Sequence, residues 1–167
     1  MEELKTIEIL KTAILIENRG EAFYRNVSEQ ASNPEVKRIF DILAREEVLH
    51  AKILRDKYAE FVKTQKISPT KFPKPEDESI SSLILSDEVK NQISGAGYEA
   101  AAISAAIDME NRAIEVYSDR AKNATDSNEK KLFKWLADWE REHHKLLFDL
   151  DRDLKERIWN DNSFWPF

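Results

Sequence analysis

An internal repeat sets the strongest constraint on this chain, because the same acidic and histidine residues recur 93 positions further along the sequence. Glu17-Asn18-Arg19 recurs as Glu110-Asn111-Arg112, and the Glu-x-x-His pair at 47–50 recurs at 140–143. In both copies the Glu-x-x-His pair begins 30 residues after the isolated glutamate. A chain with this register is expected to fold into two equivalent halves that contribute matching side chains.

Hydrophobic residues recur at three- and four-residue spacing through most of the chain, which predicts long amphipathic helices. Four helices are expected, over about residues 2–30, 34–65, 97–123 and 127–157. Asn33 is a favourable N-cap and Pro34 a favourable first residue for the second helix, and Asp126 or Ser127 can cap the fourth. Signals for β-strands are essentially missing from the sequence.

The order of these helices predicts the fold. Short loops join them into two αα-hairpins, residues 2–65 and 97–157, and the proline-bearing segment 66–96 is long enough to cross the length of a bundle. Residues 80–93 in this crossover are expected to form a short helix. Two hairpins joined by one long crossover is the connectivity of ferritin-like four-helix bundles, so we expect an all-α protein with a single domain over residues 1–167. The aromatic tail, residues 158–167, is expected to pack on the bundle or to form a subunit contact, as in a homodimer.

Composition excludes several classes of function. The net charge of −6 and the pI near 5.2 argue against a nucleic-acid partner. The sequence has no apolar run near the ~20 residues that span a bilayer and no signal-peptide pattern, so a cytoplasmic protein without a membrane partner is expected. The absence of cysteine excludes disulfides, thiolate zinc sites and iron–sulfur clusters within these residues. A metal bound here must therefore be held by Glu, Asp and His.

The repeated polar residues lie in the middle of the apolar helix faces, where an unpaired carboxylate is strongly penalised. No basic residue lies one turn away on the same face to neutralise them. Four carboxylates and two imidazoles are the ligand set of a dinuclear metal site, with carboxylates able to bridge the ions. The expected ligands are Glu17, Glu47, His50, Glu110, Glu140 and His143. The alternative is a duplicated internal polar network that holds no metal.

The ligand chemistry narrows the choice of metal. Hard oxygen ligands combined with imidazole suit two Fe ions or two Mn ions, and Zn can occupy such a site adventitiously. The small residues Gly20 and Ala113 follow the two isolated glutamates by one turn and would leave room beside the ions.

Other polar residues near this face have simpler interpretations. Tyr24 and Tyr117 are expected to be buried tyrosines whose hydroxyls find hydrogen bonds, with tuning of the site or electron transfer as the alternative. Glu21 is a candidate further ligand, but its repeat counterpart is Ile114, which favours a boundary or solvated residue. His144 is expected on the surface.

The chain resembles the rubrerythrin branch of the ferritin-like di-iron superfamily over nearly its whole length. The residues that carry this resemblance are Glu17 with Phe23-Tyr24, Glu47-x-x-His50, Glu110 with Tyr117, and Glu140-x-x-His143. The resemblance implies a non-haem di-iron centre held by the six residues named above. The chain differs from rubrerythrins proper in two respects. They append a rubredoxin domain whose iron is bound by cysteines, and they carry an additional glutamate where this chain has Ala113.

The leading functional hypothesis is an oxidoreductase that reduces peroxide or activates dioxygen at the di-iron site. Without a rubredoxin domain, its re-reduction would require an external electron-donor protein or a small reductant. One alternative is a ferroxidase or iron-handling protein whose substrate is Fe(II). The other is a metal-stabilised structural module without turnover.

Overall fold

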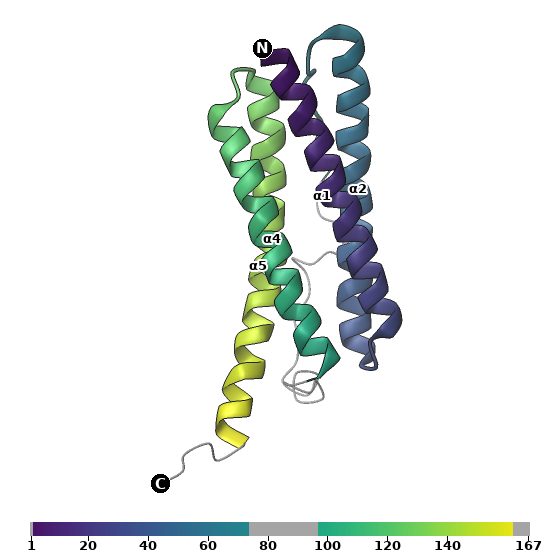
Figure 1. The fold of residues 1–167 in the computed structure, drawn as a ribbon, viewed down its shortest axis with the longest axis vertical. Helices are drawn as coiled ribbons and strands as arrows, with labels where there is room; N and C mark the ends of the chain where they lie inside the picture. The colour runs from purple at the N-terminus through teal and green to yellow at the C-terminus, as the bar shows by residue number, and fades with distance from the viewer. Residues whose placement is uncertain (1, 74–96, 162–167) are drawn as a thin grey trace.

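The protein is an all-α bundle. The computed structural model describes residues 2–73 and 97–161, which form four helices in two hairpins (Figure 1). Helix α1 spans Glu2–Gln30, α2 spans Pro34–Thr64, α4 spans Tyr98–Asn123 and α5 spans Ser127–Asp161. The predicted fold class is therefore confirmed, and none of these four helices is both long and apolar enough to cross a membrane. The short helix expected at 80–93 and the end of the aromatic tail lie outside the described residues.

The helix ends follow the local sequence signals. The Asn33 side chain accepts hydrogen bonds from the backbone N–H groups of Glu35 and Val36, and Pro34 follows as the first helical residue. Helix α2 ends at Thr64 and is capped by Gln65, whose φ of 57° lies in the left-handed region. Asp126 caps α5 by accepting backbone hydrogen bonds at 2.9 and 2.8 Å. Both predicted N-caps are thus confirmed, because these side chains satisfy amide groups that the first helical turn leaves unpaired.

The two hairpins pack side by side with α1 lying against α4 (Figure 1). Helix α2 ends at one end of the bundle and α4 begins at the other (Figure 1). Helix α5 extends past the ends of the other helices and continues to Asp161, four residues beyond the expected boundary at 157. Trp159 in this extension is 63% exposed, and the beginning of the aromatic tail continues the helix.

Two hydrophobic clusters form the core, one toward each end of the bundle. Repeat-equivalent residues fall into opposite clusters: Tyr24 and Phe40 belong to one, and their counterparts Tyr117 and Phe133 belong to the other. This exchange indicates that the two hairpins are related by a pseudo-twofold rotation about an axis across the bundle. The repeated acidic and histidine residues lie between the two clusters, at the level of this pseudo-twofold axis.

A buried polar network fixes three helices at one end. Arg120 of α4 donates to Glu129 of α5 at 2.7 Å and to the Thr6 hydroxyl of α1 at 3.0 Å. The pairing gives each buried charge a partner, as burial of ions requires. It lies at the end of the bundle away from the Tyr24 cluster and is separate from the central polar residues.

Candidate metal centre

The structure brings all six predicted ligands into one buried layer between the hydrophobic clusters. Each of these residues has at most 3% of its surface exposed. They form two groups, within each of which the potential ligand atoms lie within 4.8 Å of one another. The first group is Glu17, Glu47, His50 and Glu140, and the second is Glu47, Glu110, Glu140 and His143. Glu47 and Glu140 belong to both groups, which is the arrangement that two bridging carboxylates require.

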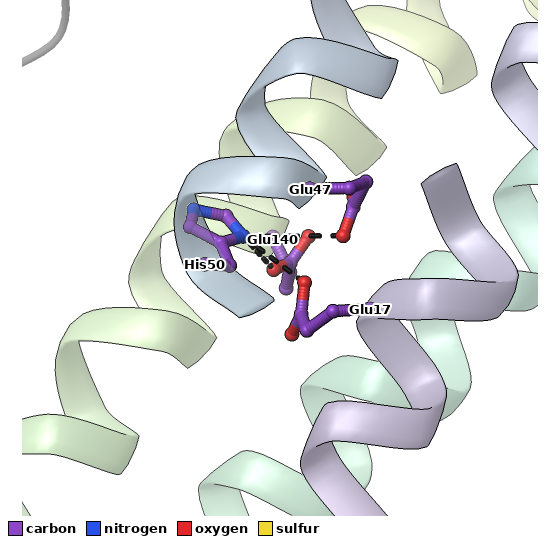
Figure 2. A group of neighbouring side chains, drawn as sticks. All are labelled: Glu17, Glu47, His50 and Glu140. Atoms are coloured by element: carbon purple, nitrogen blue, oxygen red, sulfur yellow. Dashed lines mark hydrogen bonds and ion pairs between the residues drawn. The ribbon is translucent and has the colours of Figure 1, made fainter. Parts of the chain in front are cut away.

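The first group is assembled from α1, α2 and α5 (Figure 2). The Nδ1 atom of His50 lies 3.0 Å from Glu140 Oε1 and 3.2 Å from Glu17 Oε2. It lies 4.0 Å from the nearer Glu47 oxygen, one turn earlier on its own helix. Because Glu140 comes from the second hairpin, neither hairpin forms this group alone.

The second group mirrors the first. The Nδ1 atom of His143 lies 3.0 Å from Glu140 Oε2, 3.4 Å from Glu110 Oε1 and 3.6 Å from Glu47 Oε1. Here Glu47 is the residue supplied by the other hairpin. Each histidine therefore presents the same ring nitrogen to a cluster of carboxylates from both halves of the repeat.

Two buried tyrosines hold the outer carboxylates in place. The Tyr24 hydroxyl donates to Glu110, and the Tyr117 hydroxyl donates to Glu17, each across the α1–α4 contact. Burial, followed by the nearby carboxylates, raises the pKa of both phenols well above the usual value, so they remain protonated donors. The expectation that these hydroxyls find hydrogen bonds is confirmed. Their partners are carboxylates of the site itself.

The crowding of charge perturbs the protonation of the centre. Burial and then the charge of Glu140 raise the pKa of Glu47 well above its usual value and that of Glu110 to about 8. Burial lowers the pKa of His50, but Glu140 and Glu17 outweigh it and raise that pKa to about 9. Burial opposes ionisation of Glu140 as well, yet the two histidines lower its pKa below the usual range. In the metal-free protein, the protons on these groups thus supply the positive charge that bound cations would otherwise supply.

The donor atoms fit a pair of divalent ions. Glu140 Oε1 and Oε2 each lie 3.0 Å from a histidine Nδ1, yet neither oxygen nor His143 Nδ1 makes a well-directed hydrogen bond among the described residues. A buried polar atom without a good hydrogen bond destabilises the fold unless a bound ion or water molecule contacts it. Four carboxylates balance the charge of two divalent ions, and the imidazoles complete a ligand set suited to Fe, Mn or Zn. The buried Glu/His clusters therefore fit a di-metal site.

Comparison with known families agrees with this geometry. The family model described as Rubrerythrin matches residues 8–151, which include both hairpins and all six central residues. The chain belongs to the rubrerythrin family. Searches of curated proteins and of solved structures found no significant match.

One residue of this rubrerythrin domain that contacts the centre was not predicted from the sequence. Glu46 is buried, and its Oε2 accepts hydrogen bonds from His143 Nε2 at 2.7 Å and from Trp139 Nε1 at 2.6 Å. It lies next to Glu47 in the sequence, so helical geometry turns it about 100° away from the ligand face. Its partners lie on the other hairpin, and the only sequence signal was a second consecutive glutamate.

Two further residues that the sequence placed near this face lie outside the centre. Glu21 pairs with Arg25 at 2.9 Å and belongs to neither ligand group. His144 stacks on Phe148 with ring centroids 5.7 Å apart. The boundary interpretation of Glu21 is therefore supported.

A pocket of about 130 Å³ reaches the centre between α1 and α4. Its lining includes the small residues Gly20 and Ala113, as expected from the sequence, and the exposed residues Arg19 and Arg112. A Cβ atom added at Gly20 would lie 3.2 Å from Glu47 Cδ, so the glycine lets this carboxylate approach α1 closely. Three carboxylates of the second group line the pocket: Glu47, Glu110 and Glu140.

Proposed function

We propose that this rubrerythrin-family protein is a di-iron oxidoreductase that reduces peroxide, or activates dioxygen, with electrons from an external donor. Glu17 and His50 would hold one ion, and Glu110 and His143 would hold the other. Glu47 and Glu140 would bridge the two. The observation that carries the proposal is the pair of buried ligand groups that share two carboxylates, at the end of a small pocket.

The pair of ions would supply two electrons at one place and Lewis-acid stabilisation of the oxygen charge that develops. For peroxide, the balance is H₂O₂ plus two protons and two electrons giving two water molecules. The chain's own residues would position the metal ligands and exclude bulk water. Tyr24 and Tyr117 hold the outer carboxylates, the hydrophobic clusters limit water, and the pocket's size favours a small oxidant over a bulky one.

The metal content is tested first. The purified full chain, loaded anaerobically with Fe(II) and desalted, should contain close to two ions per chain by elemental analysis. The double variant Glu47→Ala/Glu140→Ala removes both bridging carboxylates and should abolish binding. Glu21→Ala is the matched control, because Glu21 lies one turn beyond Glu17 but outside both groups, and it should bind normally. One ion or none in the loaded wild type would overturn the dinuclear proposal.

The activity is tested by mixing the Fe(II)-loaded protein with peroxide, or with dioxygen, in a stopped-flow spectrometer. Rapid oxidation by peroxide, followed by chemical re-reduction and repeated turnover with the iron retained, is the expected result. Oxidation accompanied by release of ferric iron would instead identify a ferroxidase. A centre that binds iron but reacts with neither oxidant would identify a structural role.

A further inference from the structure

The two halves of the centre differ in what lies behind their histidines. Glu46 and Trp139 are equivalent positions of the repeat, 93 residues apart, yet one is acidic and the other aromatic. Each precedes a bridging glutamate, and each lies beside the histidine of the opposite hairpin. The pseudo-twofold relation of the halves is therefore broken at this pair of positions.

The His143 ring is held by a carboxylate. Glu46 accepts from His143 Nε2 at 2.7 Å, which places the proton on that nitrogen and leaves Nδ1 free to face the ligand cluster. A carboxylate behind a metal-binding imidazole fixes its tautomer and orientation and increases its basicity as a ligand. The Trp139 indole donates to the same Glu46 oxygen at 2.6 Å and helps to keep this carboxylate in place.

The His50 ring is held by aromatic rings. Its Nε2 is buried and has no hydrogen-bond partner within the described part of the chain. Trp135 and Trp139 pack against it nearly perpendicular, with ring centroids 5.3 and 5.2 Å from that of the imidazole. An indole face can receive an N–H only weakly, so these rings position His50 without the support of a charged acceptor.

The hydrogen bonds to the outer glutamates are matched in the two halves. Tyr117 donates to Glu17 of the first group as Tyr24 donates to Glu110 of the second, and both groups share the same bridging carboxylates. The outer glutamates are held alike in the two groups. They therefore do not offset the difference between Glu46 behind His143 and the indole rings behind His50.

We infer that the two ion positions are unequal, and that Glu46 is a positioning residue which makes the Glu110–His143 position the tighter one, to be filled first. The inference rests on the proposed metal centre. Loss of the hydrogen-bond partner behind a metal-binding histidine typically changes metal affinity by about 10–100-fold. This range sets the expected difference in affinity between the two positions. Glu110, which belongs to the tighter position alone, also lines the pocket.

The test is anaerobic calorimetric titration of the metal-free full chain with Fe(II). The wild type should bind in two steps whose affinities differ by about 10–100-fold. Two steps alone are not sufficient, because the first ion repels the second even in a symmetric centre. The assignment therefore uses single-histidine variants: His50→Ala should retain the tight step and His143→Ala should lose it. In a symmetric centre the two variants would behave alike.

Glu46→Gln provides the selective test, because the amide keeps the shape and removes the charge. It should weaken the first step by about 10–100-fold while leaving the second step nearly unchanged. A purely structural role for Glu46 would weaken both steps and lower the thermal midpoint of the metal-free protein. Trp135→Phe is the matched control: it alters the aromatic wall beside His50 but leaves Glu46 and its hydrogen bonds to His143 and Trp139 in place, so it should preserve the tight step.

The outcomes separate this inference from the proposed function. Equal behaviour of the two histidine variants, or an unchanged first step in Glu46→Gln, would overturn the inequality and leave the di-iron proposal standing. Failure of the wild type to bind Fe(II) would overturn both.

Discussion

Removal of metal should make the stability of this protein fall as the pH rises, which is an unusual direction for an acidic domain. The cause is the pair of groups whose pKa values in the folded chain lie far above their ordinary values, Glu110 at about 8 and His50 at about 9. Between the unfolded and folded pKa values, the folded state holds protons that the unfolded state has released. Stability must then decrease with increasing pH through that window.

The magnitude follows from the size of the shifts. Each unit of pKa shift corresponds to about 1.36 kcal/mol. The pKa of Glu110 rises from 4.5 to about 8, so this group alone costs ~5 kcal/mol once pH exceeds 8. That of His50 rises from 6.5 to about 9, and its stabilising contribution of ~3 kcal/mol is present below pH 6.5 and lost by pH 9. Because the groups interact, the combined loss is smaller than the sum, but it is large against the 5–15 kcal/mol that usually separates folded and unfolded domains.

The assay is urea unfolding of the chelator-treated protein, followed by circular dichroism at several pH values between 6 and 9. The free energy of unfolding should fall by several kcal/mol across this range. The free energy of unfolding of protein loaded anaerobically with Fe(II) should fall much less over the same pH range, since the ions replace the protons as the positive partners of the carboxylates. Glu110→Gln is the matched variant: it removes one perturbed carboxyl, so its metal-free form should show a shallower dependence. A metal-free stability that is flat or rises from pH 6 to 9 would refute the electrostatic reasoning.

Three other substitutions have distinct expected results. Gly20→Ala puts a methyl group 3.2 Å from Glu47 Cδ, so Fe(II) affinity by calorimetry should fall about tenfold, and an unchanged affinity would mean that the bridging carboxylate has room to move. Tyr24→Phe removes the hydroxyl that donates to Glu110 and should lower the free energy of unfolding by about 1–3 kcal/mol in urea, a cost that would be absent if water replaced the hydroxyl. Asn33→Ala removes the cap of α2 and should cost ~1 kcal/mol without changing metal stoichiometry, whereas a loss of bound iron would connect this loop to the centre.

The sequence predicted well which six side chains meet at the centre, because the signal of each is local. A glutamate in the middle of an apolar stripe is visible from helical spacing alone, and the repeat supplied an internal check on all six positions. The residues that depend on the docking of the two hairpins were not visible in the same way. Tyr24 reaches Glu110 only because α1 and α4 pack against each other, and Glu46 reaches His143 only across the hairpin interface. The end of α5 was underestimated because the apolar stripe fades after Leu154 while no glycine or proline stops the helix before Asp161.

The division of the centre between the two hairpins also has a consequence for how the chain is held together. Helix packing is extensive within each hairpin, whereas each ligand group combines residues from both. In the loaded protein proposed above, Glu47 and Glu140 would tie together points 93 residues apart, in a chain that has no cysteine with which to form a disulfide. Such a cross-link would open and close with the supply of iron rather than with the redox state of thiols. Iron starvation would then weaken the contact between the two hairpins before it disturbed the helix packing within either hairpin.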